Sequence, residues 1–231
     1  MPGKIKSETI EGLRQFDSAT VSNAIEHFGV RDMTMGYTHN ELKCQTPDIA
    51  KPMVGYAVTC TGDTTTPGDT RPSRVEEVVE LVQSAPKPTV LVIQHVGPER
   101  NRACFFGDMF CTVLEKLGGV GLITDANGRD YQGIQQRTPD FHVFSSGAVV
   151  SHGYGAYIDF NITVSICGLT IKPGDLLHGD ANGLVSVPID VADDTVNRAR
   201  EVVEIESDYF NFLESDRFSI DELKRRIVPH E

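Results

Sequence analysis

Long apolar runs are absent from this chain of 231 residues. A membrane-spanning helix needs about 20 predominantly apolar residues in succession, and no segment approaches that length. The first residues, MPGKIKSETIEGLRQF, also have no apolar segment of the kind that a secretion signal carries. We therefore expect a cytoplasmic protein that does not contact a membrane.

Positive charge is scarce. Lys and Arg total 21 against 33 Asp and Glu, which gives a formal net charge of −12. This balance opposes non-specific binding to the phosphates of nucleic acids and to anionic membranes, so no nucleic-acid partner is expected. A basic protein partner stays open, and so does an anionic small molecule, because arginines, backbone amides and a metal ion can outweigh the overall field locally.

Cysteine motifs and nucleotide-binding motifs are also missing. The odd number of cysteines, the lack of a CxxC pair and the lack of a Cys/His cluster at zinc-ligand spacing favour buried free thiols over disulfides or zinc fingers. The five are Cys44, Cys60, Cys104, Cys111 and Cys167. No Gly-rich nucleotide loop follows the first predicted strand, so a nucleotide-dependent methyltransferase finds no support.

The remaining composition is that of an ordinary globular protein, with 39% hydrophobic and 23% charged residues. The length suits one domain with a substantial core. We predict a single domain over residues 1–231, with its core at about 53–188, an N-terminal helical extension at 1–52 and a C-terminal helical extension at 189–231.

Strand-forming segments alternate with helices through the middle of the chain. Runs rich in β-branched and aromatic residues predict strands at VGYAVTCT (54–61), TVLVIQHV (89–96), VGLIT (120–124), FHVFSS (141–146) and ITVSI (162–166). Pro72 and Ser73 begin a predicted helix that ends near Val82, and Gly107 begins another that ends at Leu117. This alternation is typical of βαβ units, so we predict an α/β fold around a largely parallel sheet.

Both ends of the chain favour helices. Ser18 is the predicted N-cap of a helix that ends at Gly29. After Pro188 a long helix is predicted to run to about Leu213, and Ser219-Ile-Asp-Glu222 forms a capping box for a last short helix. The long helix carries more apolar residues than a lone surface helix needs, so they pack either on a second subunit, which is our hypothesis, or on the helix's own domain.

Two turns carry the residues with the clearest chemistry. The first is Phe106-Gly107-Asp108-Met109-Phe110, where a strand-to-helix turn should expose backbone amides that bind an anion. The second is the segment TDANGRD (124–130), which puts Arg129 and Asp130 just past the end of a buried strand, where α/β sheets place ligands. The two turns could face one pocket.

Simpler interpretations exist for each of these residues. An adjacent Arg and Asp after a glycine is often a turn with a surface ion pair, and Asp108 could be an acidic residue favoured by the helix dipole. His152, Tyr154 and Asp159 invite an acid–base role, while a hydrogen-bonded structural role is the alternative for His152. For His95 the preferred interpretation is a hydrogen-bonded structural histidine, and for Asp180 it is a residue that shapes a turn.

At these turns the chain resembles a known family. The order G-D-x-F, a helix, Gly-Gly, V-G-L-I-T-D and G-R-D is similar to the active-site core of the class II 4-hydroxy-4-methyl-2-oxoglutarate aldolases and their RraA-like relatives. MVGYAVTC (53–60), SHGYGAYIDF (151–160) and PGDLLHGDANGLVSVP (173–188) extend the resemblance over roughly residues 18–190. It implies a swivelling β/β/α sandwich with N-terminal helices and a long C-terminal helix, assembled as a homotrimer or a homohexamer.

The resemblance also implies roles for the residues of the two turns. The backbone of Gly107, Asp108, Met109 and Phe110 would bind the carboxylate of an oxo-acid substrate. Arg129 would bind the keto oxygen and stabilise an enolate, Asp130 would anchor Mg²⁺ or Mn²⁺, and Asp108 would hydrogen-bond water on that metal. These roles suit carbon–carbon cleavage, because a cation and a guanidinium both stabilise the charge that grows on the enolate oxygen.

The implied function is therefore a divalent-metal-dependent lyase that releases pyruvate from 4-hydroxy-2-oxo diacids, decarboxylates oxaloacetate, or does both. A protein-binding regulator of ribonuclease activity, like the RraA proteins, is the alternative from another class, and a lyase for a different oxo-acid is a third. Aldolases of this family borrow an acidic residue from a neighbouring subunit, for which Glu201 and Glu204 are candidates. Substrate, stereochemistry and physiological metal are open at this point.

Overall fold

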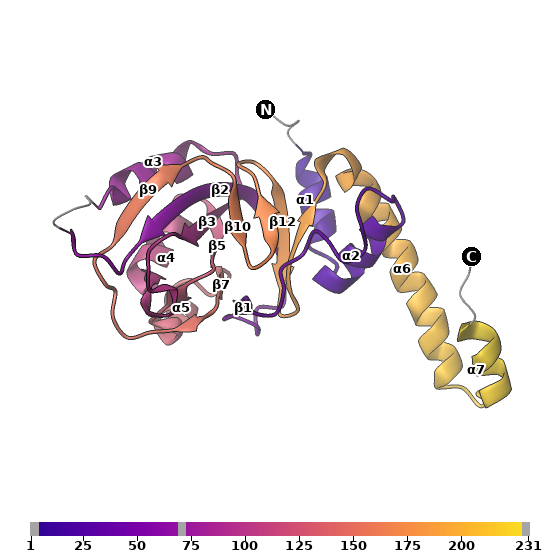
Figure 1. Cartoon of the computed structure of the whole chain (residues 1–231). Coiled ribbons are helices and arrows are strands. Elements are labelled where there is room, and N and C mark those ends of the chain that lie inside the picture. The colour runs from indigo at the N-terminus through magenta and orange to yellow at the C-terminus, as the bar shows by residue number, and fades with distance from the viewer. Residues whose placement is uncertain (1–4, 69–72, 228–231) are drawn as a thin grey trace.

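A computed structural model describes residues 5–68 and 73–227 of the chain. Its centre is an eight-stranded mixed sheet in the order β1-β7-β5-β3-β2-β12-β13, with β9 also paired to β2 (Figure 1). Four neighbouring strands are parallel: β2 (Met53–Asp63), β3 (Thr89–His95), β5 (Gly119–Thr124) and β7 (His142–Ser145). The remaining strands pair antiparallel: β1 (Lys43–Cys44), β9 (Ala156–Phe160), β12 (Leu176–Asp180) and β13 (Gly183–Val187).

The central sheet is covered on both faces. Alternate residues of β3 belong to two different cores. Leu91 and Ile93 lie in the core that contains residues of helices α3 to α5. Val90 and Val92 lie in the core that contains the hairpin of β10 (Val164–Ile166) and β11 (Leu169–Ile171). Burial on both faces explains the nearly continuous apolar runs that predicted these strands. The α/β class and the sandwich of sheet, hairpin and helices are confirmed.

Helices and a second small sheet position the candidate site. Helix α3 (Val75–Ser84) joins β2 to β3, α4 (Asp108–Lys116) precedes β5, and α5 (Tyr131–Arg137) precedes β7. The short strands β4 (Cys104–Phe106), β6 (Asn127–Gly128) and β8 (Gly147–Ala148) form a parallel sheet of their own. Because β4 leads into α4 and β6 leads into α5, their pairing brings the starts of these two helices together.

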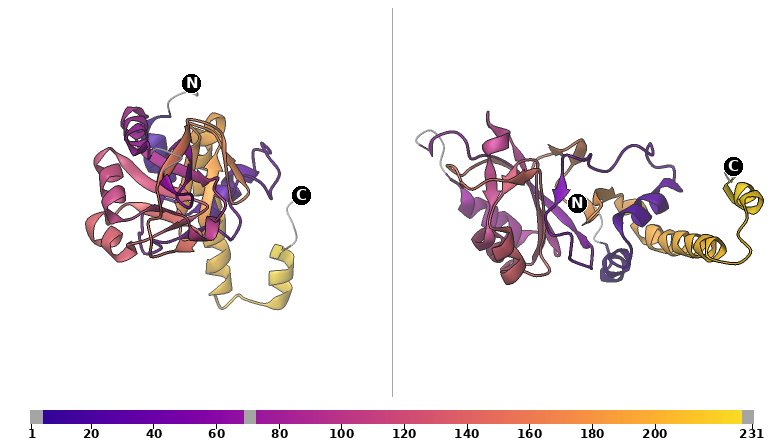
Figure 2. Two further views of the ribbon diagram at one scale, coloured as in Figure 1. Left: turned by 60° about the vertical axis from the view of Figure 1, so that its left-hand side comes forward. Right: turned by 90° about the horizontal axis from the view of Figure 1, so that it is seen from below.

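The terminal helices pack together and share a core with one end of the sheet. Helices α1 (Ser7–Leu13) and α2 (Ser18–Glu26) pack against α6 (Ala192–Leu213), and α6 extends away from the body before α7 (Ile220–Ile227) turns back (Figures 1 and 2). Val196 and Val202 in the first half of α6 are buried, whereas Ile205 and Phe210 further along are exposed. The first half therefore packs on its own chain. None of the helices within the described residues is long and apolar enough to cross a membrane.

Several predicted helix boundaries were wrong. The N-cap of α2 is Asp17, not Ser18, because the Asp17 carboxylate accepts the Thr20 amide at 2.7 Å. The same helix ends at Glu26 rather than Gly29. Helix α3 begins at Val75, two residues after Ser73, and Pro72 lies outside the described residues.

Other predicted details hold. In the capping box Ser219 Oγ accepts the Glu222 amide at 3.2 Å, although the Glu222 carboxylate pairs with Arg225 and Arg226. Asp180 shapes its turn by accepting the Asn182 amide at 2.8 Å, and it also accepts the amide and hydroxyl of Ser18. All five cysteines are free, and all except the half-buried Cys44 are buried.

His178 fastens the N-terminal helices to the sheet, and its loss should destabilise the fold. Its Nε2 lies 3.2 Å from the Leu13 carbonyl oxygen and 3.0 Å from that of Phe16. His178→Ala removes this donor and leaves a cavity, so we expect the free energy of unfolding at pH 7.5 to fall by about 2–4 kcal/mol. Denaturant unfolding of the two proteins measures this difference.

The same residue makes stability depend on pH. Burial lowers the pKa of His178 below its ordinary value, so the folded protein keeps the imidazole neutral where the unfolded chain already binds a proton. The contribution of the neutral His178 to the free energy of unfolding is therefore fully present above about pH 6.5. This contribution is lost as the pH falls below that value. The loss of unfolding free energy between pH 7.5 and 5.5 should be smaller in His178→Ala than in the wild type, and an equal loss would contradict this assignment.

Candidate active site

The turn that carries Arg129 and Asp130 is held by backbone hydrogen bonds to the neighbouring strands. The Arg129 amide donates to the Phe106 carbonyl at 3.0 Å, and the Val149 amide donates to the Gly128 carbonyl at 3.0 Å. Asp130 then takes a left-handed conformation, with φ +60°, at the N-cap of α5. Its carboxylate Oδ2 lies 3.3 Å from Arg129 Nε, so the guanidinium and the carboxylate sit side by side.

The second turn lies directly against this pair. Gly107 is extended, with φ −146°, and precedes the first residue of α4. A β-carbon at Gly107 would stand 2.6 Å from Asp130 Oδ2 and 3.4 Å from Arg129 Nε. Only a glycine therefore lets the Asp130 carboxylate lie over the start of α4. The two turns, separate in the sequence, form one site.

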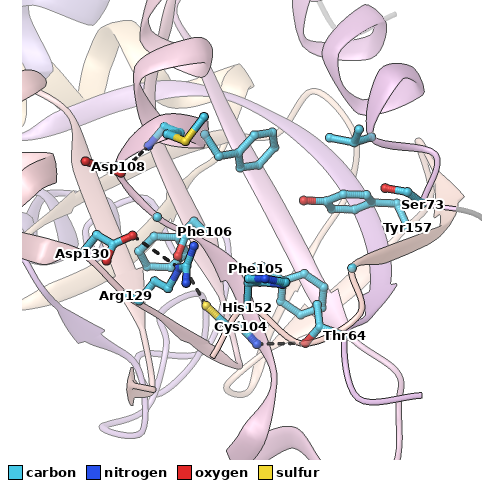
Figure 3. Close-up of a pocket in the computed structure, with 15 residues that line it drawn as sticks. Thr64, Ser73, Cys104, Phe105, Phe106, Asp108, Arg129, Asp130, His152 and Tyr157 are labelled. Atoms are coloured by element: carbon cyan, nitrogen blue, oxygen red, sulfur yellow. Dashed lines mark hydrogen bonds and ion pairs between the residues drawn. The ribbon is translucent and has the colours of Figure 1, made fainter. Parts of the chain in front are cut away.

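These residues line a cavity of about 290 Å³. Figure 3 places Asp108, Arg129 and Asp130 on one side of it and Tyr157 and Ser73 on the other. The full lining is Thr64, Ser73, Val75, Cys104, Phe105, Phe106, Gly107, Asp108, Met109, Phe110, Arg129, Asp130, His152, Gly155 and Tyr157. The cavity thus combines one charged side with aromatic walls, which is a common composition for a small-molecule site.

Asp108 is held by partners that the sequence did not reveal. Its Oδ2 accepts from Arg137 Nε at 3.0 Å, and its Oδ1 accepts the Met109 amide at 2.8 Å. The hydrogen bond from Arg137 is the main reason why the pKa of Asp108 lies below its ordinary value. Asp108 is therefore an ionised acceptor at the edge of the cavity.

The start of α4 has the geometry of an anion site. The first amides of any helix have no carbonyl four residues earlier to donate to, and the helix dipole adds partial positive charge there. One of these amides, that of Met109, is already bonded to Asp108, and the Met109 side chain is 82% exposed. Phe110 instead packs near Tyr157, with ring centroids 6.3 Å apart.

Sequence reasoning missed several residues of the cavity. Cys104 donates its amide to Thr64 Oγ1 at 2.9 Å, and burial raises the pKa of its thiol, so it is a wall residue rather than an ionised nucleophile. Tyr157 comes from β9 and forms part of the aromatic side. The cysteine lies within a CFFGD run that pointed only to the glycine. Tyr157 lies in the SHGYGAYIDF segment, from which the sequence singled out other residues.

Of the residues for which the sequence allowed either a catalytic or a structural role, some line the cavity and others do not. His152 lines the cavity, with its Nδ1 2.7 Å from the Gly153 carbonyl oxygen, whereas Tyr154 lines a neighbouring cavity. Asp159 accepts from Thr61 Oγ1 at 3.1 Å. His95 is buried and lies outside the lining of the cavity, as expected of a structural histidine.

The candidates for a borrowed acid lie elsewhere on the chain. Glu201 pairs with Arg198 in a cluster near the start of α6. Neither Glu201 nor Glu204 belongs to the lining of the cavity in a single chain. They could reach such a site only from another subunit.

The donor set around Asp130 fits a hard divalent cation. Asp130 is a partly exposed carboxylate whose partner Arg129 is also partly exposed, and such a pair is weak. A single carboxylate suits Mg²⁺ or Mn²⁺, since Mg²⁺ keeps most of its water ligands in proteins. The Asp130 carboxylate lies beside Gly107, in the position that a side chain at residue 107 would fill.

Gly107→Ala should therefore weaken binding of a divalent metal without unfolding the protein. The extended backbone accepts alanine, but the new methyl group would displace the Asp130 carboxylate. We expect divalent-metal affinity to fall by about 10- to 100-fold, with the free energy of unfolding changed by less than about 1 kcal/mol. Activity titrated against Mg²⁺ measures this effect. Gly68→Ala, where a methyl group would meet no atom of the described residues within 4 Å, is the control, and equal metal dependence in both variants would contradict the geometry.

Comparison with known proteins identifies the family of the chain. The sequence pattern of the RraA-like family, described as Aldolase/RraA, matches residues 18–186 and so covers both turns. The chain belongs to the RraA-like family. The sequence resemblance is thereby confirmed.

Named relatives within the RraA-like family are distant. A protein of Pseudomonas putida named "putative 4-hydroxy-4-methyl-2-oxoglutarate aldolase" is 31% identical over 50% of this chain and 68% of its own length. A protein of the same name from Halalkalibacterium halodurans is 27% identical over 54% of this chain and 58% of its own length. The matched segment thus spans little more than half of the latter protein, and only 21% of the Legionella pneumophila protein DlpA.

Solved structures of RraA-like fold match more of the chain. An uncharacterized protein from Pseudomonas syringae superposes with a TM-score of 0.75 and 21% identity, covering 98% of this chain and 97% of that one. Streptomyces coelicolor RraAS2, described as an unusual member of the RNase ES inhibitor RraA protein family, gives a TM-score of 0.68 and 21% identity over 89% and 96% of the two chains. At this identity the two structures support the fold alone.

Proposed function

We propose that this chain is a divalent-metal-dependent carbon–carbon lyase that releases pyruvate from 4-hydroxy-2-oxo diacids, decarboxylates oxaloacetate, or does both. The observation that supports this most is the meeting of three groups in one cavity: the Arg129 guanidinium, the Asp130 carboxylate and the N-terminus of α4. The guanidinium and the helix N-terminus suit a 2-oxo-acid, which has a carboxylate and a keto oxygen side by side, and the Asp130 carboxylate suits a metal ion beside it. The names of the distant relatives agree with this class.

The carboxylate of the substrate would bind at the start of α4. Amides of the Gly107–Phe110 turn would donate to it, and the helix dipole would add to the attraction. The Met109 amide would have to exchange its bond to Asp108 for one to the substrate. This contact fixes one end of the substrate, so that its keto oxygen faces Arg129.

Arg129 would then stabilise the charge that cleavage produces. In an aldol cleavage the 4-hydroxyl group gives its proton to water, the C3–C4 bond breaks, and its electron pair forms the enolate of pyruvate while C4 becomes a carbonyl group. A proton from water added to C3 then gives pyruvate. In decarboxylation the bond to the departing carboxylate breaks and leaves the same enolate. Because the negative charge gathers on the C2 oxygen in both reactions, a guanidinium placed there binds the transition state better than the substrate.

Asp130 is the residue that would hold Mg²⁺ or Mn²⁺, and Asp108, on the same side of the cavity, would accept hydrogen bonds from its water ligands. A divalent cation bound there supplies further positive charge to the keto oxygen. Phe105 and Tyr157 line the cavity as aromatic wall residues. Phe106 packs beneath the Arg129 turn, where a β-carbon at Gly128 would meet its ring.

Pyruvate formation tests the proposal. The full-length protein should release pyruvate from 4-hydroxy-4-methyl-2-oxoglutarate or from oxaloacetate, followed by coupling to lactate dehydrogenase, with a rate that depends on added Mg²⁺ or Mn²⁺. Excess EDTA should remove the activity, and excess Mg²⁺ should restore it. Full activity in EDTA, or none on either substrate with either metal, would refute the proposal.

A protein-binding regulator of ribonuclease activity is the second candidate. The likeness in fold to RraAS2 and the net charge of −12, which favours a basic partner, support it. A complex with a ribonuclease that forms equally well with and without metal, together with no lyase activity, would favour this function over the first.

We also propose that the protein is cytoplasmic, that its residues 1–231 form one domain, and that it assembles as a homotrimer or a homohexamer. The second half of α6 exposes the large apolar side chains of Ile205 and Phe210, which a neighbouring subunit would bury. Mass measurement in solution would separate a monomer, a trimer and a hexamer.

A further inference from the structure

Three potential metal ligands from distant parts of the sequence meet away from the lyase cavity. They are His39, Glu41 and Cys167, and their ligand atoms all lie within 4.8 Å of one another. His39 and Glu41 are exposed, whereas Cys167 is 7% exposed. More than 120 positions separate the histidine from the cysteine, so no spacing in the sequence could reveal the group.

The backbone holds these residues in place. The His39 amide donates to the Cys167 carbonyl at 2.9 Å, and the neighbouring Thr38 amide donates to the Leu184 carbonyl at 3.0 Å. Leu42, at the other end of this short loop, is buried in the core cluster beside the hairpin. The loop that contains His39 and Glu41 is therefore held against the β10–β11 hairpin, which contains Cys167, by a hydrogen bond and by the packing of Leu42.

The hairpin turn itself is unusual at Cys167. Cys167 and Gly168 join β10 to β11 with φ values of +43° and +85°. Turns of this kind favour Asn, Asp or Gly at both positions, because a β-carbon is strained there. Gly168 also gives space to the imidazole, since a β-carbon at that position would stand 2.8 Å from His39 Cδ2. The turn thus combines a strained cysteine with a glycine over which the histidine packs.

Charged neighbours allow a cation to bind. A cation bound here would replace the thiol proton of Cys167, and it would lie close to a positively charged neighbour, Arg100. Arg100 pairs with Glu41 at 3.1 Å, but both side chains are about half exposed, so this pair is weak and can open.

We propose that His39, Glu41 and Cys167 form a binding site for one zinc-like divalent cation, through imidazole nitrogen, carboxylate oxygen and thiolate sulfur. This donor set suits a borderline-soft ion such as Zn²⁺ or Co²⁺, which takes four ligands, so one position is left for water. The Asp130 site offers a hard carboxylate alone and suits Mg²⁺. The ion would tie the loop of residues 38–42 to the β10–β11 hairpin.

Cobalt titration tests this site directly, because a thiolate bound to Co²⁺ gives a charge-transfer absorption in the near ultraviolet. The metal-stripped full-length protein should develop this band up to one equivalent of Co²⁺, and Zn²⁺ should abolish it. Cys167→Ser should remove the band, and His39→Ala should weaken Co²⁺ binding at least about 10-fold. Cys44→Ser, which removes a half-buried thiol elsewhere, should keep the wild-type band, and so should Asp130→Asn, because a carboxylate ligand gives no thiolate band.

Two results would overturn the proposal: no band in the wild type, or a band that persists in Cys167→Ser. His39→Ala keeps the test informative if Cys167→Ser does not fold, because His39 is exposed and its loss leaves the core intact. Wild-type affinity in folded His39→Ala would contradict the assignment of the imidazole. The readout is independent of lyase activity, so failure of the proposed function would leave this test unaffected.

Discussion

Asp130→Asn should lower kcat/KM for pyruvate release by about 10³-fold at saturating Mg²⁺. The substitution removes the carboxylate that would hold the cation beside the keto oxygen, and loss of one electrostatic stabiliser of an oxyanion typically lowers turnover by about 10²- to 10³-fold. Asparagine is the appropriate replacement because Asp130 has a φ of +60°, a conformation that Asn tolerates better than most residues. Steady-state kinetics with the lactate dehydrogenase assay measures the effect.

The control for this experiment is Asp48→Asn, which neutralises an exposed carboxylate in the loop before β2. It should leave kcat/KM within about twofold of the wild type and the free energy of unfolding within about 0.5 kcal/mol. A fall of less than tenfold in Asp130→Asn, with the protein folded, would mean that this carboxylate does not hold the metal.

Arg129→Lys should lower kcat and kcat/KM together, each by about 10²-fold. Lysine preserves the positive charge but not the planar fork, in which Nε faces Asp130 and the terminal nitrogens can donate to the substrate. An interaction made mainly in the transition state lowers both constants equally, whereas loss of simple substrate binding raises KM and leaves kcat unchanged. Full progress curves at several substrate concentrations separate the two.

Arg200→Lys provides the matched comparison for Arg129→Lys. Arg200 is exposed on α6, where its Nη1 donates to Asn197, and its replacement should change neither constant. If Arg129→Lys raised KM alone, the guanidinium would be a binding group for the substrate, and its role in stabilising the enolate would be wrong.

The sequence predicted the parts of the fold that depend on local pattern. The strands β2, β3 and β5 are buried on both faces, so their apolar runs stand out. Strands alternating with helices also limit the topology, because parallel strands need crossover connections. The prediction that the Gly107 and Arg129 turns could face one cavity follows from the same rule, and the distance from Gly107 to the Asp130 carboxylate agrees with it.

Contacts between distant segments could not be predicted in this way. The bond from Arg137 to Asp108 and the place of Tyr157 in the cavity depend on how α5 and β9 pack, which no periodicity records. The N-cap of α2 was misassigned because Asp17 and Ser18 are both good capping residues, and only the position of the Thr20 amide decides between them.

Exchange of the methyl protons of pyruvate with D₂O tests the central claim most directly, because it requires the enolate to form beside Arg129 and Asp130 but no carbon–carbon bond to break. The account predicts exchange, followed by NMR, that depends on Mg²⁺ and falls at least about 100-fold in both Arg129→Lys and Asp130→Asn. Exchange no faster than with Mg²⁺ alone, or equally fast in the two variants and the wild type, would contradict it.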